Sequence, residues 1–474
     1  MSSIPSITII GAGISGLSAA QTLYKNGFTD ITILEARDRI GGRINTVKKG
    51  DFKFQIEEGA QWLHGDKNNP LENVTQSNKI RKTLSGECTK FFSTNGSLTP
   101  HEQNVINKGL EYFKVLLKKL FDKEHKKLPL SCDVLSYLKN EWMKIYAGHT
   151  PVEKRLLEKL FKCLHNQECL LDGCSSLAQA SLPNYNKYLE LEGGNYTFDD
   201  GFAQVVNAVA EIIPSKNIQL NSVVTTIEWN IPNKSYTSES KVVVRYSLNG
   251  ESHRVESDHV IVTLPLGCLK KLHKTMFNPP LPKSKASVIN SIGFGILNKV
   301  ILYYEEQFWE DDVMVMNLLW DELNDGNKFG IQIVNFHVLQ DARSGKSYLV
   351  GWASGDNAVK LERMSDEEIS DVCTDLFRKC FGKEVSRPDA IYVTRWHSDP
   401  FSLGSYSYAA VNSNAEDNTV LAEPVVGDNN EKPQILFAGE ATHPTFFSTV
   451  HGAYESGKRE AERIIGMGYK IPSI

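Results

Sequence analysis

The chain contains 474 residues, of which 41% are hydrophobic and 23% are charged, and its formal net charge at pH 7 is -5. These proportions are typical of a globular enzyme, and the length predicts two closely packed domains rather than one core. The small negative charge argues against binding to nucleic acid or to an anionic membrane surface. No apolar run is long enough to span a membrane.

The first forty residues predict a dinucleotide-binding unit. A strand over Ser6–Ile10 is followed by a glycine motif, a helix and a second strand that ends at Glu35. In such a unit Gly11 allows the tight turn, Gly13 lets the backbone approach a pyrophosphate, and Gly16 lets the helix pack on the strand. The helix N-terminus then faces the phosphates, and Glu35 accepts a hydrogen bond from a ribose hydroxyl.

The residues after Glu35 favour FAD over NAD. Ala36 and Arg37 follow the acid, and a second glycine pair, Gly41-Gly42, stands directly before Arg43. This stretch resembles the extended FAD motif of the flavin amine oxidase superfamily. There the arginine is expected to reach the pyrophosphate, because a guanidinium group can form paired hydrogen bonds with phosphate oxygens.

A helical insertion follows. After a strand-turn-strand segment over 44–56, Gly59-Ala60 offers a second place where the backbone can lie against a flat ring. Apolar residues then recur at three- and four-residue spacing, which predicts helices over Leu71–Ile80, Glu102–Lys119, Ser131–Tyr146 and Val152–Leu170.

The eight cysteines predict no metal site, because the sequence has no Cys-x-x-Cys pair and no zinc-type spacing. Cys163, His165, Cys169 and Cys174 lie close together in the sequence, but their Cys-x-His and Cys-x4-Cys spacings on a predicted helix favour buried thiols over metal ligands. Free thiols are typical of a reducing compartment. The N-terminus shows no secretory leader and the C-terminus no Ser-Lys-Leu signal, so we expect a cytosolic protein.

The chain returns to the nucleotide-binding unit near Gly193. A helix is predicted over Gly201–Ile213, with strands over Ile218–Trp229, Lys241–Tyr246 and His259–Pro265. A second, mixed sheet is predicted from Val300–Tyr304, Gly330–Val334 and Tyr348–Trp352, with a helix over Asp366–Phe381. A buried strand over Lys432–Glu440 and a helix over Ala453–Ile465 complete the unit.

The predicted fold class is therefore α/β, with two domains. A discontinuous, Rossmann-like FAD-binding domain takes residues 1–75, 193–284 and 425–474. A substrate-binding domain, made of the mixed sheet and the helical insertion, takes residues 76–192 and 285–424.

Six motifs, in order along the chain, resemble the FAD-dependent polyamine oxidases of the spermine oxidase and N-acetylpolyamine oxidase type. They are Gly11–Gly16, Glu35–Arg43, Gly59–His64, Gly293–Lys299, Trp396–Tyr406 and Phe437–Gly452. The resemblance spans nearly the whole chain and is weakest from about 70 to 190. It implies non-covalent FAD and oxidation of a carbon next to a secondary amine nitrogen by O2. The implied products are an aminoaldehyde, a shorter amine and hydrogen peroxide.

The motifs and the resemblance together predict the cofactor-binding residues. Ser448–Gly452 opens a helix, whose amides can stabilise the negative charge of reduced flavin near N1 and O2. By resemblance, Glu440 binds a ribityl hydroxyl and Val224 contacts the adenine. The full set is Gly11, Ala12, Gly13, Ser15, Gly16, Glu35, Ala36, Arg37, Gly42, Arg43, Gly59, Ala60, Gln61, Trp62, Val224, Trp396, Glu440, Thr449 and Val450.

Lys299 and His64 are the predicted catalytic residues. The matching lysine of the family holds a water against flavin N5, and burial would lower the pKa of such an ammonium group. An exposed lysine at a strand end is the alternative. A protonated amine has no lone pair to drive hydride loss, so the site must favour the neutral reacting nitrogen, and His64 is a suitable polar partner. A structural histidine is the alternative.

The predicted substrate-binding residues are His64, Leu297, Tyr406, Ser448, Thr449, Glu190 and Glu192. Tyr406 and Trp396 would form aromatic walls that attract a polyamine through cation–π contacts, or else belong to the core. Glu190 and Glu192 would anchor the far ammonium, or else form an acidic loop face. Leu297 stands where acetylpolyamine-type relatives carry a polar residue, so the acetylation state of the substrate stays open.

The predicted function is the oxidation of spermine, N-acetylspermine or spermidine by a monomer or homodimer. The alternatives are another enzyme of this fold, such as an L-amino acid or monoamine oxidase, and a catalytically silent flavin-binding protein. An amino acid oxidase needs an arginine clamp for the substrate carboxylate, which the sequence does not place. No cysteine follows Cys380, so the C-terminal attachment cysteine of monoamine oxidases is missing.

Overall fold

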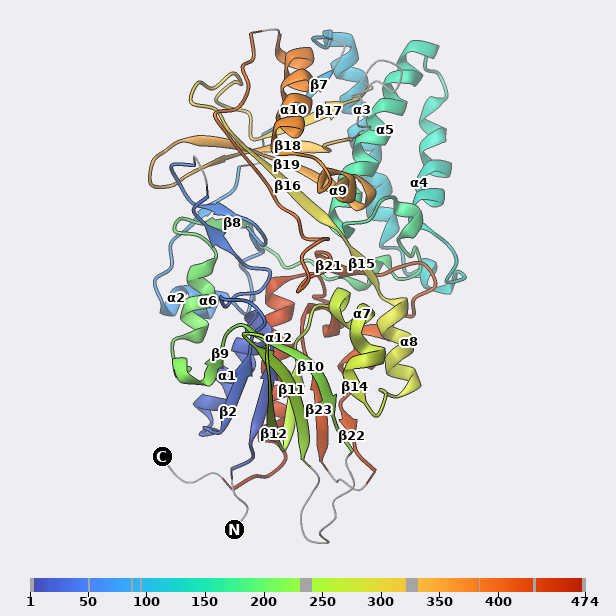
Figure 1. Cartoon of the computed structure of the whole chain (residues 1–474). Coiled ribbons are helices and arrows are strands. Elements are labelled where there is room, and N and C mark those ends of the chain that lie inside the picture. The colour runs from blue at the N-terminus through green and yellow to red at the C-terminus, as the bar shows by residue number, and fades with distance from the viewer. Residues whose placement is uncertain are drawn as a thin grey trace.

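The computed structural model of the chain describes residues 4–49, 52–86, 88–93, 96–230, 241–320, 331–382, 384–428 and 432–470. Its helices and strands form two regions, one above the other in Figure 1. The lower region contains the first strands, the green strands and the last helix. The upper region contains the helical insertion and the yellow-to-orange sheet.

A six-stranded sheet forms the centre of the lower region. Its order is β22-β23-β13-β1-β2-β9, with β1 Ile7–Ile10, β2 Ile31–Leu34, β9 Ile218–Gln219, β13 His259–Val262, β22 Val425–Val426 and β23 Pro433–Phe437. All neighbouring strands are parallel except β22 and β23. Three stretches that lie far apart in the sequence therefore build one sheet, and the predicted α/β class is confirmed.

Successive side chains of a strand point to opposite faces of its sheet. The two faces of this sheet pack against different elements. Ile7 and Ile9 pack in a core with three helices, α1 (Ile14–Lys25), α6 (Ala203–Ala210) and α12 (Val450–Ile465). Ile10 packs in a second core with the sheet β12-β11-β10-β14. The bounds of these strands are β10 Ser222–Glu228, β11 Val242–Leu248, β12 Glu251–Ser257 and β14 Phe277–Asn278.

The single strand predicted over 218–229 is wrong, because β9 and β10 belong to different sheets. Asn221 stands between them with φ of 55°, a left-handed conformation that asparagine adopts more readily than most residues. Asn221 N donates to Arg37 O and Ser222 N donates to Glu35 O, at 2.8 Å each. The turn therefore lies against the acidic end of β2.

The upper region is built on a mixed sheet of order β20-β16-β19-β18-β17-β7. The strands are β7 Thr89–Ser93, β16 Leu297–Tyr303, β17 Val315–Leu319, β18 Asn335–Gln340, β19 Ser347–Ser354 and β20 Ala390–Val393. The strand predicted over 330–334 is wrong: Gly330 lies outside the described residues, 331–334 form no strand, and β18 begins at Asn335. Helix α10 (Asp366–Phe381) has the predicted bounds and covers one face through Phe377.

The helical insertion consists mainly of α3 (Pro100–Leu120), α4 (Val134–Trp142) and α5 (Pro151–Asp172). Thr99 with Glu102, and Thr150 with Glu153, form capping boxes that fix the starts of α3 and α5. Helix α5 ends at Asp172 and is capped by Gly173, whose φ of 63° suits a left-handed C-cap.

The remaining elements are shorter or peripheral. They are α2 Glu72–Ser77, α7 Leu266–Met276, α8 Lys283–Ser291, α9 Gly355–Leu361, α11 Asp417–Ala422, β3 Thr46–Val47, β4 Ile56–Glu57, β5 Leu63–His64, β6 Lys82–Leu84, β8 Asn195–Phe198, β15 Gly293–Gly295 and β21 Tyr406–Tyr408. Within the described ranges, no helix combines the length and the apolar character that crossing a membrane requires.

The contact between α1 and α12 gives a test of the fold. A Cβ atom at Gly457 would lie 1.9 Å from Ser15 O and 3.1 Å from Ala19 N. Because backbone atoms cannot swing away as side chains can, we expect Gly457→Ala to lower the free energy of unfolding by about 1–3 kcal/mol in urea denaturation. Gly466→Ala is the control, since its nearest neighbour lies 3.4 Å away. Equal stabilities of the two variants would contradict this packing.

Candidate active site

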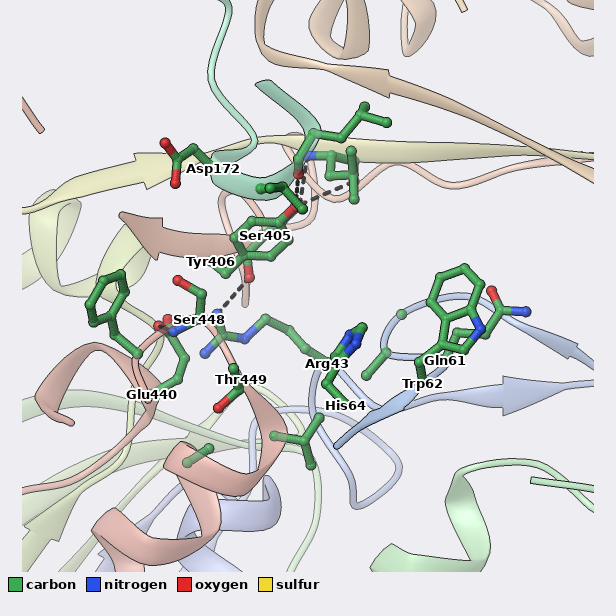
Figure 2. A pocket seen from close by; sticks show the side chains of 18 of the residues that line it. Arg43, Gln61, Trp62, His64, Asp172, Ser405, Tyr406, Glu440, Ser448 and Thr449 are labelled. Carbon is green, nitrogen blue, oxygen red and sulfur yellow. Dashed lines mark hydrogen bonds and ion pairs between the residues drawn. The ribbon is translucent and has the colours of Figure 1, made fainter. Parts of the chain in front are cut away.

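A cavity of about 1550 Å³ is lined by residues of both regions. Its walls include the β1–α1 turn, residues 35–37, 41–44 and 58–65, the C-terminal half of α5, and the start of α12. Typical small-ligand sites have roughly 300–1,000 Å³, so this cavity has room for a dinucleotide and a second molecule. Figure 2 shows part of its wall.

The N-terminus of α1 opens on this cavity without a capping side chain. A Cβ atom at Gly13 would meet no atom within 4 Å, so this glycine faces open space. A Cβ atom at Gly16 would instead lie 2.0 Å from Gly11 O, so Gly16 packs against the turn. Uncapped helix amides beside open space are the features that a pyrophosphate group requires.

Glu35 is fixed at the end of β2, where it is 6% exposed. Its Oε2 accepts from Ala12 N at 2.7 Å, and its Oε1 accepts from Arg37 N at 2.9 Å. An ionised carboxylate has about four acceptor positions, so Glu35 retains capacity for a ribose hydroxyl. The Arg37 guanidinium is held by Asp399 through two hydrogen bonds of 2.8 and 2.7 Å.

Arg43 and Glu440 connect segments from opposite ends of the chain. Arg43 Nη1 donates to Ser405 O at 2.6 Å and to Glu440 Oε1 at 3.0 Å. Glu440 Oε2 accepts from Ser407 Oγ at 2.6 Å and from Ser448 N at 2.9 Å. Figure 2 shows Arg43 and Glu440 joined on the cavity wall. The predicted contact of Arg43 with a pyrophosphate therefore has to use guanidinium nitrogens other than Nη1.

Lys299 lies on β16 and is 3% exposed, so the alternative of an exposed strand-end lysine is wrong. Its Nζ donates to Glu57 O at 2.9 Å, to Gly59 O at 2.8 Å and to Gln61 Oε1 at 2.8 Å. An ammonium group has three N–H donors, so all of them are used. Burial lowers the pKa of Lys299 far below its usual value, and the carboxylates of Glu57 and Glu58 only partly oppose this effect.

Three histidines on the cavity wall are neutral near pH 7. The His64 side chain lines the cavity, and the low-dielectric surroundings there lower its pKa. Burial also lowers the pKa of His337 and of His451 to about 4. His64 Nδ1 lies 2.9 Å from Asn195 Oδ1, so with this amide orientation Nδ1 donates and Nε2 is left as an acceptor.

One aromatic ring lies beside Lys299, and further rings follow along the wall. The Trp352 ring centroid lies 5.6 Å from that of Trp62 and 5.1 Å from Lys299 Nζ. Trp396 and Tyr406 also line the cavity, and each is fixed by one hydrogen bond. Trp396 Nε1 donates to Glu58 O, and the Tyr406 hydroxyl donates to a backbone carbonyl of α5.

Most of the predicted site residues line this cavity. They are Gly11, Gly13, Ser15, Glu35, Ala36, Arg37, Gly42, Arg43, Gly59, Ala60, Gln61, Trp62, His64, Glu190, Val224, Leu297, Lys299, Trp396, Tyr406, Glu440, Ser448, Thr449 and Val450. Ala12, Gly16 and Glu192 do not line it. The placement predicted for Glu192 is wrong, because this exposed residue pairs with Lys67 at 3.3 Å on the surface.

Sequence reasoning missed two carboxyl groups on the wall, those of Glu168 and Asp172 on α5. The spacing of these two acids in the sequence could have identified them. Leu160, Leu164, Glu168 and Asp172 follow one another at four-residue steps, so two acids continue a buried apolar stripe. Acids are rarely buried without a partner, so acids in such a stripe indicate a functional role. Trp352 and His337 were also missed, and their strands carry no pattern that marks them.

The chain matches known proteins along nearly its full length. Residues 14–465 match the model of the family described as flavin containing amine oxidoreductase. The chain belongs to this family. It is 33% identical over 491 residues to the human peroxisomal N(1)-acetyl-spermine/spermidine oxidase, with 98% of this chain and 95% of that protein covered. It is 29% identical over 541 residues to the probable polyamine oxidase 5 of Arabidopsis thaliana, with 97% and 98% covered.

A solved structure shares the fold. Cyclohexylamine oxidase from Brevibacterium oxydans IH-35A superposes with a TM-score of 0.74, at 21% identity, over 98% of this chain and 99% of that one. The family membership confirms the predicted cofactor and class of enzyme: the protein is an FAD-dependent amine oxidoreductase. The uncapped α1 N-terminus, the open space at Gly13 and the free capacity of Glu35 fit FAD.

Gly13 gives a test of the cofactor position. Gly13→Ala should not disturb the fold, because its φ of -71° suits any residue and the new Cβ meets nothing within 4 Å. The same Cβ would occupy the space assigned to the pyrophosphate. We expect the Kd for FAD to rise by about tenfold or more, measured by adding FAD to the apoprotein and following flavin fluorescence. Gly466→Ala should leave this Kd unchanged, and an unchanged Kd for Gly13→Ala would refute the assignment.

Asp172 gives a test of the charge on the cavity wall. Burial raises the pKa of Asp172 to about 7, from 3.8 in an exposed side chain. A carboxyl group with a raised pKa in the folded state destabilises the fold increasingly as pH rises from about 4 to 7. Asp172→Asn should therefore stabilise the enzyme at pH 8, by up to a few kcal/mol at about 1.4 kcal/mol per pKa unit, and much less at pH 4.5.

The measurement is thermal unfolding of the holoenzyme at the two pH values. The ionisable groups coupled to Asp172 are Glu168, Cys169, Cys174, Tyr185, Tyr406 and Tyr408, and Asp172→Asn leaves them in place. Asp375→Asn, an exposed substitution on α10, is the control. A stabilisation that is the same at both pH values would contradict the raised pKa of Asp172.

Proposed function

We propose that this enzyme oxidises polyamines at a carbon next to a secondary amine nitrogen. The products would be an aminoaldehyde, a shorter amine and hydrogen peroxide. The observation that carries the proposal is the charge of the cavity wall: among the described lining residues, acids without an ion pair and neutral histidines occur, and every lysine and arginine has a partner. The similarity to the human N(1)-acetyl-spermine/spermidine oxidase supports the same class of substrate.

Every lysine and arginine among the described lining residues has a partner. Arg37 pairs with Asp399, Arg43 with Glu440, Lys90 with Glu310 and Asp312, and Lys114 with Glu111, while Lys299 donates to three oxygens. The carboxyl groups of Glu168, Asp172 and Glu190 have no such cation. A polycation is the substrate whose charge complements this wall.

The pairing of the arginines on the cavity wall also argues against an amino acid oxidase. Such an enzyme needs an arginine that holds the substrate carboxylate in a two-bond contact. Arg37 and Arg43 are the only arginines among the described lining residues, and carboxylates of the protein already hold both. An incoming carboxylate would also meet the unpaired acids of α5.

The residues around Lys299 and His64 fit the chemistry of amine oxidation. FAD, when bound, accepts the hydride and passes the electrons to O2. His64 is neutral and has Nε2 free as an acceptor, so it can take a hydrogen bond from a neutral reacting amine. Because its pKa is lowered, Lys299 can lose a proton near neutral pH and return it, which suits the proton steps of oxygen reduction.

The direct test is anaerobic mixing of the purified holoenzyme with spermine, N-acetylspermine and spermidine in turn. We expect at least one of them to bleach the flavin absorbance rapidly. Mass spectrometry of the products after aeration then identifies the aminoaldehyde and therefore the bond that is broken. If none of the three bleaches the flavin, while cyclohexylamine or another simple amine does, the substrate class proposed here is wrong.

Lys299 gives a second test. Lys299→Met should keep FAD bound, because Lys299 Nζ contacts protein oxygens only, but it should slow flavin reduction or reoxidation. We expect a loss of roughly 10²-fold, the lower end for a group that moves protons, in stopped-flow traces. Lys274→Met, at an exposed position of α7, is the control. Turnover of Lys299→Met at the rate of the control would rule out the proposed role.

Location and assembly stay predictions. The human relative is named as peroxisomal, whereas the sequence of this chain predicts the cytosol. A monomer or a homodimer is expected, and fractionation of cells with size-exclusion chromatography of the purified enzyme would test both expectations.

A further inference from the structure

Two carboxyl groups near the end of α5 face the cavity together. Glu168 and Asp172 are four residues apart, so they lie on one face of the helix, about 6 Å apart along its axis. Neither forms an ion pair with any residue in the described ranges. Two neighbouring acids in an enclosed place repel each other and favour a positively charged ligand.

Asp172 is the less satisfied of the two. The Tyr185 hydroxyl donates to Glu168 Oε2 at 3.3 Å, whereas the Asp172 carboxyl group has no hydrogen bond to a described residue. The nearby Tyr406 hydroxyl is committed to the Leu170 carbonyl. Figure 2 shows Asp172 and Tyr406 on the same wall of the cavity. An enclosed carboxylate without a partner is costly, and a ligand cation would remove that cost.

An organic cation fits this place better than a metal ion. Ca²⁺ takes six to eight oxygen ligands, and Mg²⁺ demands near-ideal octahedral geometry. Within the described ranges, no group of three or more His, Cys, Asp or Glu side chains is arranged to hold a metal. The two carboxyl groups are enough for an ammonium group, which has three N–H donors to distribute between them.

We propose that Asp172, with Glu168 beside it, binds a free terminal ammonium group of the substrate and makes the enzyme select amines with a charged end over amines with an acetylated end. This inference rests on the proposed function. An acetamide carries no charge and offers one N–H donor. An ammonium group forms charge-assisted hydrogen bonds, which are roughly twice as strong as neutral ones. Asp172 is therefore a specificity residue of the substrate site.

Two probe amines that differ by one ammonium group measure what that group contributes to binding. The holoenzyme is titrated with 1,8-diaminooctane and with n-octylamine while the flavin absorbance is followed. The probes share the eight-carbon chain and one amine, and they differ in the second ammonium group. For Asp172→Asn we expect the Kd of the diamine to rise about tenfold or more, and the Kd of octylamine to change less than about twofold.

Matched variants separate charge from structure. Asp172→Glu keeps the charge and should keep the preference for the diamine. Asp375→Asn removes an exposed surface charge on α10 and should change neither Kd. With substrates, the ratio of kcat/KM for spermine to that for N1,N12-diacetylspermine should fall about tenfold in Asp172→Asn.

The outcomes are distinct. If Asp172→Asn changes the Kd of the diamine and of octylamine by the same factor, the inference is overturned, even where polyamines bleach the flavin. If no polyamine bleaches the flavin and the diamine preference still depends on Asp172, the proposed function fails while the ammonium site stands.

Discussion

The ion pair between Arg43 and Glu440 is the contact on which the cavity depends. Arg43 directly follows the second glycine pair, and Glu440 lies three residues after β23, the last strand of the lower sheet. Ser405 and Ser407 bind the same pair. Glu440 is 4% exposed, so removal of its partner would leave a buried charge, at a cost of about 3–5 kcal/mol. Three distant parts of the sequence thus meet on the wall of the cavity.

The basic groups on the cavity wall are paired with acids or kept neutral by burial. Arg37 is paired with Asp399 and Arg43 with Glu440, and burial keeps the histidines neutral. Burial also lowers the pKa of Lys299 and raises that of Glu168 and Asp172 to about 7. A cation that binds beside Glu168 and Asp172 favours the ionised form of both acids.

Much of this architecture follows from the sequence, because local chemistry fixes it. The glycine motif, the helix of residues 366–381 and the Gly-Glu end of the last strand depend on turns, periodicity and capping within a few residues. The break at Asn221 and the start of β18 at Asn335 were missed, since tertiary pairing decides where those strands begin. Glu168 and Asp172 were not predicted as wall residues, because their i,i+4 spacing shows that they share a helix face but not what that face meets.

The most direct measurement is a crystal structure of the holoenzyme, chemically reduced so that it cannot turn over, with spermine bound. Our account predicts a terminal ammonium group within hydrogen-bond distance of the Asp172 and Glu168 carboxylates, with a secondary amine near His64 and Lys299. Spermine bound outside this cavity, or bound inside it with neither end at α5, would contradict the account.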